Sequence, residues 1–412
     1  MNYNKRKKVA ETPKMIYNNR EVVYKKLVIR EVNAMLKSYE ICNFKSFKNK
    51  TKIDLEKTNY QTLADTNVSG SLLKGLMFVG ANASGKSNSI IAIKFLLDCL
   101  FGKNDVNMDA CICIFSGNPV MELKYEFEID GANIGYAISY QRIDKLICEE
   151  LKVDDVSVFS RNGSVAKVSI NTEMTHTDVP KKTLFLRDIY FNTKFRGNVI
   201  LQKWFNFLEN SVYIDLYEKT LTQYKDIDLS LKSYIESVGT GDINAFFTEH
   251  NFEQTIEYDN KVTGNTVSME SAEKMIFFKR KGIEDPIPFM FESLGNKNLL
   301  NLLPAFFHCV RNGGMLILDE FSSGFHNELE QLLLRYFMHK ASAGQIVFVS
   351  HSTNLLSNSI LRPDQIYSVE FGSEGSKIKR FSSEKPREAQ NLEKMYLGGV
   401  FSGIPKYEHT FK

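Results

Sequence analysis

Residues 75–87 read GLMFVGANASGKS, an apolar run that leads directly into a glycine-rich loop. The loop from Gly80 to Ser87 matches the pattern G-x-x-x-x-G-K-[S/T]. Residues 88–101, which follow it, carry apolar side chains at helical spacing. Glycines let the backbone fold so that its N–H groups point at phosphate oxygens, and the first turn of a helix adds a positive dipole. The stretch therefore predicts a phosphate-binding loop between a buried strand and a helix.

Two residues of this loop have defined chemical roles in such a site. The Lys86 ammonium would reach the β- and γ-phosphates of a bound nucleotide, and the Ser87 hydroxyl would ligate Mg²⁺. The alternative, a chance glycine loop, requires the strand, the loop and the helix to fall in register by accident. The predicted binding residues of the loop are Gly80, Asn82, Ala83, Ser84, Gly85, Lys86, Ser87 and Asn88.

Two further apolar runs end in residues suited to the same chemistry. Residues 315–318 are followed by Asp319 and Glu320. Asp319 would hold magnesium through water, and Glu320 would orient or deprotonate the attacking water. The alternative is that this pair caps the next helix. Residues 346–350 are followed by His351, which could hydrogen-bond the γ-phosphate, although a histidine at a strand end is by default structural. Because ligands bind at the carboxyl ends of the strands in such sheets, we expect these side chains to share one site.

The pattern along the chain predicts an α/β fold. Helix and strand patterns alternate from residue 292 onward, which is typical of a largely parallel sheet with helices on both faces. Residues 121–141 alternate around Asp130-Gly131, a dipeptide suited to a tight hairpin turn. We expect a mixed, mostly parallel sheet with inserted β-hairpins and a helical subdomain. The other expected elements are strands at 36–41 and 51–55, short strands up to 170, helical structure over 185–250, short strand-like pieces over 251–281, helices at 299–311 and 327–340, and a last strand at 365–370.

The predicted division of the chain has four segments. Residues 1–34 form a basic N-terminal extension, 35–104 the first part of the nucleotide-binding core, 105–290 an insertion with an antiparallel β part and a helical part, and 291–412 the second part of the core. The extension holds nine Lys and Arg against three Glu, in a chain whose net charge is only +3. It is interpreted either as a solvated tail or as a basic arm for nucleic acid or a partner.

Composition indicates the compartment. The six cysteines are scattered without the spacing of a disulfide framework or a zinc site, which suits a reducing cytoplasm. No apolar stretch approaches the roughly 20 residues needed to span a bilayer, so no membrane partner is expected.

The ordered set of motifs resembles the ABC-type ATPase heads of SMC and DNA-repair proteins. It resembles most closely the stand-alone AAA-family ATPases of bacterial abortive-infection and anti-phage systems, such as the AbiL and RloA group, which are cousins of the ATPase half of OLD-family nucleases. The resemblance covers nearly all of residues 35–405. It is carried by LKSYEICNFKSF, GANASGKSN, ESLGNKNLLNLLP, GGMLILDEFSSGFHNEL, QIVFVSHSTNLL and NLEKMYLGGVFSGIP.

The resemblance implies ATP with Mg²⁺ as the bound nucleotide and a site shared by two copies of the chain. In this superfamily two heads sandwich ATP, and a Ser-x-Gly element of one head touches the γ-phosphate bound by the other. Ser293 and Gly295 match that element, with Asn296 where relatives usually have threonine. His326 matches a histidine expected at the dimer seam. The glutamine that many ABC heads place near magnesium has no clear counterpart in residues 105–145.

Two functions are compatible with these motifs. The first is an ATP-hydrolysing homodimeric switch of an anti-phage system that senses a phage protein and controls a separately encoded effector, a nuclease or a toxin. The second is an SMC-like DNA-binding ATPase of repair or recombination. The first is favoured because no heptad run of several turns appears between the phosphate loop and Ser293, and because charge outside residues 1–34 is near neutral. Nucleic acid stays open as a partner.

Overall fold

The computed structural model describes residues 12–18, 21–27, 34–266 and 268–404. Within these residues seven strands form a central sheet in the order β15-β14-β19-β20-β7-β21-β22. The five inner strands pair in parallel, and the two edge strands pair antiparallel to their neighbours. This confirms the mixed, mostly parallel sheet. The strands are β7 (Gly75–Gly80), β14 (Val212–Asp215), β15 (Thr220–Gln223), β19 (Gly314–Asp319), β20 (Gly344–Val349), β21 (Ile366–Gly372) and β22 (Gly375–Arg380).

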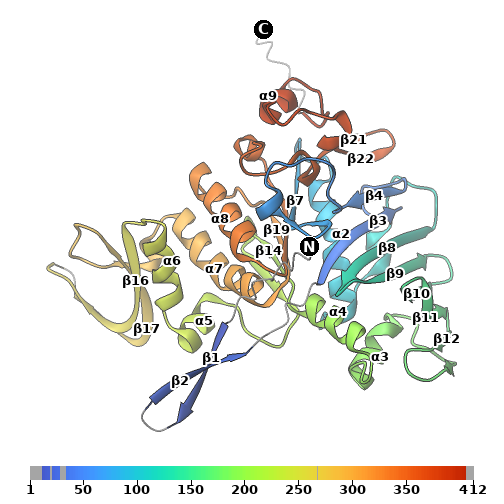
Figure 1. The fold of residues 1–412 in the computed structure, drawn as a ribbon, viewed down its shortest axis with the longest axis horizontal. Helices are drawn as coiled ribbons and strands as arrows, with labels where there is room; N and C mark the ends of the chain where they lie inside the picture. Colours follow the sequence, from blue (N-terminus) through green and yellow to red (C-terminus); the bar gives the residue numbers. More distant parts are fainter. Residues whose placement is uncertain (1–11, 19–20, 28–33, 267, 405–412) are drawn as a thin grey trace, which may run out of the picture.

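Helices cover both faces of the central sheet. Successive side chains of a strand point to opposite sides, so apolar strands give both faces an apolar surface for helices to cover. In β7, Leu76 and Phe78 join one apolar cluster, whereas Met77 and Val79 join another. The first cluster includes residues of α2 and α4, and the second includes residues of α7 and α8. Figure 1 shows α7 and α8 together on one side of the strands. These helices are α2 (Lys86–Phe101), α4 (Val199–Glu209), α7 (Leu294–Asn312) and α8 (Asn327–Lys340).

Eight of the described strands form a second, antiparallel sheet in the order β13-β12-β11-β10-β9-β8-β3-β4. Its inner face packs on the helices behind the phosphate loop: Trp204 of α4 contacts Phe127, and the Tyr39 hydroxyl donates to the Ser89 carbonyl of α2. The strands are β3 (Ala34–Cys42), β4 (Thr51–Asp54), β8 (Val120–Ile129), β9 (Ala132–Gln141), β10 (Leu146–Val153), β11 (Val156–Asn162), β12 (Val165–Val168) and β13 (Met174–His176).

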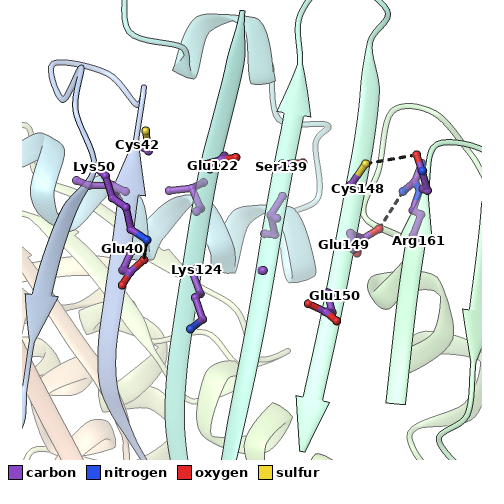
Figure 2. A pocket seen from close by; sticks show the side chains of 15 residues that line it. Glu40, Cys42, Lys50, Glu122, Lys124, Ser139, Cys148, Glu149, Glu150 and Arg161 are labelled. Carbon is purple, nitrogen blue, oxygen red and sulfur yellow. Dashed lines mark hydrogen bonds and ion pairs between the residues drawn. The ribbon is translucent and has the colours of Figure 1, made fainter. Parts of the chain in front are cut away.

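The outer face of this sheet is polar. Figure 2 shows part of it, with Glu40, Lys124 and Glu150 on three different strands around a hollow of about 440 Å³. Lys50 Nζ pairs with Glu40 Oε2 at 2.7 Å across the same face. Alternation of polar and apolar residues along the strands therefore separates a solvated face from the core.

Sheet pairing crosses the expected segment boundaries. The antiparallel sheet joins β3 and β4, from residues 35–104, with strands of the expected insertion, and β14 of that insertion lies in the central sheet beside β19. Residues 105–290 therefore do not pair as a unit of their own. The expected helical region over 185–250 is interrupted by β14 and β15. Its helices, besides α4, are α3 (Phe185–Thr193), α5 (Leu231–Val238) and α6 (Gly241–Glu249).

Two hairpins differ from the sequence expectation. The short pieces expected over 251–281 are one long hairpin of β16 (Gln254–Thr263) and β17 (Ser268–Arg280), which projects away from the central sheet (Figure 1). Within the expected N-terminal extension, β1 (Thr12–Asn18) pairs with β2 (Glu21–Leu27), and the rest of residues 1–33 lies outside the described residues. The remaining short strands and α-helices are α1 (Ala64–Asn67), β5 (Val68–Ser69), β6 (Leu72–Leu73), β18 (Ile287–Pro288) and α9 (Leu392–Leu397).

Candidate functional site

The glycine-rich loop lies where the sequence predicts it, between the end of β7 and the start of α2. Gly85 adopts a φ of +100°, which L side chains rarely adopt, and a Cβ added there would lie 2.2 Å from Ser376 Oγ and 2.5 Å from Ser46 Oγ. Glycine is therefore required at this position both by the backbone conformation and by the close approach of two serine side chains.

Those two serines form a polar chain behind the loop. Asn88 Nδ2 donates to Ser46 Oγ at 2.8 Å, and the Ser46 and Ser376 hydroxyls lie 2.7 Å apart. Ser376 Oγ donates to the Ser84 carbonyl at 2.7 Å. Sequence reasoning missed both serines. Ser46 lies in the turn between β3 and β4, and Ser376 is on β22, so only the folded chain brings them to the loop.

Polar groups inside the loop suit a phosphate. Lys86 Nζ donates to the carbonyls of Gly80 at 3.0 Å and Ala81 at 2.8 Å, and burial lowers the pKa of its ammonium. Ser84 Oγ is buried and has no hydrogen-bond partner within the described residues. A buried cation and an unpaired hydroxyl in a loop that opens a helix are the groups that a phosphate would bind.

Side-chain oxygen atoms that could bind a metal ion lie close together beside the loop. Ser87 Oγ donates to Asp319 Oδ1 at 3.0 Å, and the Tyr213 hydroxyl lies 3.4 Å from Asp319 Oδ2. Burial raises the pKa of Asp319, with a smaller contribution from the carboxylate of Asp215, its register partner on β14. A buried carboxylate next to a serine hydroxyl fits Mg²⁺, which prefers oxygen ligands and keeps several waters.

The carboxylate after Asp319 contacts the predicted histidine. Glu320 Oε1 lies 3.5 Å from His351 Nε2, and the hydrogen bond with His351 lowers the pKa of Glu320. Glu320 has a φ of +51°, sparsely populated for a residue with a Cβ, and its N–H donates to Asp319 Oδ1 at 3.1 Å. Conformations of this kind are concentrated at functional sites. Glu320 is therefore an ionised carboxylate at neutral pH, fixed at the strand end.

Part of the loop, Glu320 and His351 border one cavity of about 680 Å³. It is lined by Asn82, Ala83, Ser84, Gly85, Lys86, Ser87, Asn88, Tyr217, Glu320 and His351. Its volume is in the range of small-molecule sites. The loop, Glu320 and His351, which are far apart in sequence, are thus brought together as candidates for one site.

Tyr217 is a cavity residue that sequence reasoning missed. Its side chain is 71% exposed, and its N–H donates to Asp215 Oδ1 at 3.0 Å in the turn after β14. No glutamine lines the cavity. Tyr217, which follows β14 next to β19, lines it. The sequence does not indicate this position of Tyr217, because the preceding strand β14 has only four residues and lies in a region of helical character.

Ser293 and Gly295 lie outside this cavity. Ser293 Oγ accepts a hydrogen bond from the Asn296 N–H at 3.3 Å, so Ser293 is the N-cap of α7. A Cβ on Gly295 would lie 2.5 Å from the Gly324 carbonyl, which explains the glycine by close packing against the turn after β19. His326 also lies outside the cavity, as the exposed N-cap of α8, where its Nδ1 accepts from the Glu328 N–H at 3.3 Å.

The start of α7 is held by a buried carboxylate that the sequence did not indicate. Both oxygens of Glu292 lie 2.8 Å from Arg280 Nη2 of β17. Glu292 Oε2 also accepts from the Ser293 N–H at 3.1 Å and from Asn296 Nδ2 at 2.8 Å. Asn296, the departure from the usual threonine, therefore has a structural role in fixing the N-terminus of the helix.

Comparison with known proteins finds one family model that is similar to part of the chain. Residues 176–357 match the family described as "AAA domain, putative AbiEii toxin, Type IV TA system". The matched segment contains Ser293, Asp319, Glu320 and His351. No curated protein matches the chain.

Similar solved structures are heads of SMC proteins. The SMC head domain from Thermotoga maritima is 16% identical with a TM-score of 0.46, over 83% of this chain and 97% of that chain. An Smc head bound to the C-terminal winged-helix domain of ScpA is 14% identical with a TM-score of 0.49, over 83% and 96%. An Smc head with an extended coiled coil from Pyrococcus furiosus, bound to the C-terminal domain of ScpA, is 15% identical with a TM-score of 0.48, over 84% and 96%. The chain is similar over residues 176–357 to this AAA-domain family, and its described residues have an α/β fold with a mixed, mostly parallel central sheet.

Proposed function

We propose that the chain binds ATP with Mg²⁺ and hydrolyses it as a homodimeric switch of a bacterial anti-phage system. The observation that carries the proposal is the position of two side-chain pairs beside the glycine-rich loop. Ser87 and Asp319 form the first pair, at 3.0 Å, and Glu320 and His351 the second, at 3.5 Å. The first pair would supply a metal site, and the second would supply a base for the water that attacks the γ-phosphate.

Each of these residues has a role in hydrolysis. Lys86 would leave its two backbone carbonyls to bind the β- and γ-phosphates. Ser87 and Asp319 would hold Mg²⁺, which neutralises phosphate oxygens when it is bound. Glu320 would orient the attacking water and accept its proton, and its lowered pKa keeps its carboxyl group deprotonated. His351 would hold Glu320 in place and hydrogen-bond the γ-phosphate.

The start of α7 supports a site that two copies share. Ser293 is exposed, although it begins a 19-residue helix whose first N–H groups favour an anion. Met290, Phe291 and Leu294 around it are 60%, 72% and 48% exposed. The start of this helix could bind the phosphate of a nucleotide held by a second copy of the chain. The exposed apolar residues around it could pack against the surface of that copy. His326 would lie at the same seam.

The defence role rests on the family description, which names a toxin of a type IV toxin–antitoxin system. In this proposal the ATPase acts with a separately encoded effector, a nuclease or a toxin, and responds to a phage protein in the cytoplasm. Among the described residues, no helix has both the length and the apolar character to span a bilayer.

The alternative, an SMC-like DNA-binding ATPase, predicts a different architecture between the loop and α7. In the described part of that region, α3 to α6 have 8 to 11 residues each and are interrupted by strands. Short helices of this kind favour a compact head over a coiled-coil arm. DNA binding by the purified protein, measured across salt concentrations, distinguishes the two proposals.

The ATPase proposal is tested with two variants and a matched control. Lys86→Ala should abolish ATP binding, whereas Lys103→Ala, an exposed lysine beyond the end of α2, should bind ATP normally. Glu320→Gln should bind ATP but hydrolyse it at least about 100-fold more slowly, because the base is lost. Retained tight binding by Lys86→Ala, or undiminished turnover by Glu320→Gln, contradicts the assignment. Pull-down from infected and uninfected cells then tests for the effector and the trigger.

A further inference from the structure

Glu330 is a buried carboxyl group whose role the site described above does not explain. It lies on α8, and its side chain is only 1% exposed. Burial raises its pKa, and its Oε2 atom has no hydrogen-bond partner within the described residues. A buried carboxyl that is not fully paired costs stability, so its presence calls for a function.

The groups around Glu330 come from the two segments that carry Glu320 and His351. The side chains of Ser352, Ser322 and Asn354 face the Glu330 carboxyl and oppose the effect of burial on its pKa, with a smaller contribution from His326. Ser322 follows β19, whereas Ser352 and Asn354 follow β20. The Nδ2 atom of Asn354 is also buried without a partner among the described residues. One donor and one acceptor of the cluster are thus unpaired within the described residues.

Hydrogen bonds join the same two segments to each other and brace the second one. The hydroxyls of Ser322 and Ser350 are hydrogen-bonded to each other, and Ser350 Oγ accepts from the Ser352 N–H at 2.9 Å. The Phe321 N–H donates to the Val349 carbonyl at 2.9 Å. Glu320 directly precedes the first segment, and His351 lies within the second. Any shift of one turn against the other therefore changes the distance between Glu320 and His351.

We propose that Glu330 is a positioning residue for ATP hydrolysis, which ties the turn after β19 to the turn after β20 and so fixes Glu320 against His351. The inference rests on the proposed ATPase function. This positioning role requires a polar side chain as long as glutamate among the side chains of Ser322, Ser352 and Asn354. A negative charge is not required, because hydroxyl and amide groups can bond equally to an uncharged amide.

The test compares two side chains of similar length, Glu330→Gln and Glu330→Met. Gln keeps the polar contacts and should keep kcat within about two-fold of wild type, whereas Met removes them and should lower kcat by about ten-fold or more, since small displacements at a reacting centre are costly. The ATP Kd should change by less than about two-fold in both, because the phosphate loop is not part of the cluster. Glu328→Gln, an exposed glutamate on the same helix, is the control and should match wild type.

A double-mutant cycle separates positioning from general damage. If Glu330 acts through Glu320, then Glu330→Met should have no further effect on the residual turnover of Glu320→Gln. Ser322→Ala, which removes one bridge between the turns, should lower kcat in the same direction if Glu330→Met does not fold.

Three results would overturn the inference: unchanged kcat in Glu330→Met, equal loss in Gln and Met, or additive losses with Glu320→Gln. A wild-type protein without ATPase activity would instead contradict the proposed function, so the two failures are distinguishable.

Discussion

Replacing Gly85 by alanine tests the packing of the phosphate loop. An added Cβ would lie 2.2 Å from Ser376 Oγ, at a residue whose φ is +100°. A left-handed backbone costs a non-glycine residue about 1–2 kcal/mol. Displacing Ser376 also breaks its contacts with Ser46 Oγ and the Ser84 carbonyl, worth about 1 kcal/mol each. We therefore expect Gly85→Ala to lose about 3–4 kcal/mol of unfolding free energy.

Gly131→Ala is the matched control. Gly131 has a φ of +88° in the β8–β9 hairpin, and a Cβ there would meet no atom within 4 Å. It should lose only the backbone contribution, about 1–2 kcal/mol. Urea unfolding measures both variants, and titration with a fluorescent ATP analogue measures binding. Gly85→Ala should bind at least about ten-fold more weakly than wild type because its loop is no longer preorganised, whereas Gly131→Ala should bind normally.

Either of two outcomes refutes this reasoning. Equal losses of stability in the two variants would mean that the loop does not pack against Ser376 as the structure has it. Wild-type affinity for ATP in Gly85→Ala would mean that the loop is not the phosphate-binding element.

Substitutions at two further residues test neighbouring parts of the site. Because burial raises the pKa of Asp319, its ionised form is disfavoured in the folded state, and the free energy of unfolding falls as pH rises past the ordinary range of an aspartate. Asp319→Asn should therefore unfold at higher urea than wild type at pH 7 without metal, yet lose at least about 100-fold in Mg²⁺-dependent hydrolysis; a lower midpoint would contradict this. Tyr217→Ala should weaken ATP binding about ten-fold if the ring covers the nucleotide, and Tyr217→Phe should not; equal affinities in both variants would exclude that role.

The parts of the site that the sequence predicted are those encoded in contiguous stretches. The loop from Gly80 to Ser87, the strand before Asp319 and the strand before His351 each combine an apolar run with polar residues at its end. Since parallel strands end at the same edge of a sheet, their proximity followed from the fold class. The structure brings residues 82–88, Glu320 and His351 to one cavity.

The parts that the sequence missed depend on pairing between distant segments. β14 has only four residues and becomes recognisable as a core strand through its parallel pairing with β19. For the same reason Tyr217, which follows β14, could not be assigned to the cavity. Ser46 and Ser376 are 330 positions apart, and nothing in either local pattern indicates that they meet behind the loop.

The start of α7 is another place where the sequence alone does not decide the role of a residue. Ser293 could be interpreted from sequence as an N-cap or as a contact to a partner's nucleotide, and the structure shows the cap. The two roles are compatible because a capped helix start still presents N–H groups to an anion. Glu292 pairs with Arg280 and accepts a hydrogen bond from the Asn296 side chain. Asn296 therefore has a structural role that its position in the motif, where relatives usually have threonine, does not suggest.

Mixing two inactive variants tests the shared site most directly. Lys86→Ala lacks the loop lysine, and Ser293→Arg blocks the start of α7, so each protein alone should hydrolyse no ATP. In a mixed dimer, the intact loop of one copy faces the intact Ser293 of the other. Half of the dimers in an equal mixture then have one working site of two, so the mixture should recover about a quarter of wild-type ATPase activity. An inactive mixture in which mixed dimers are demonstrably present would contradict the shared site.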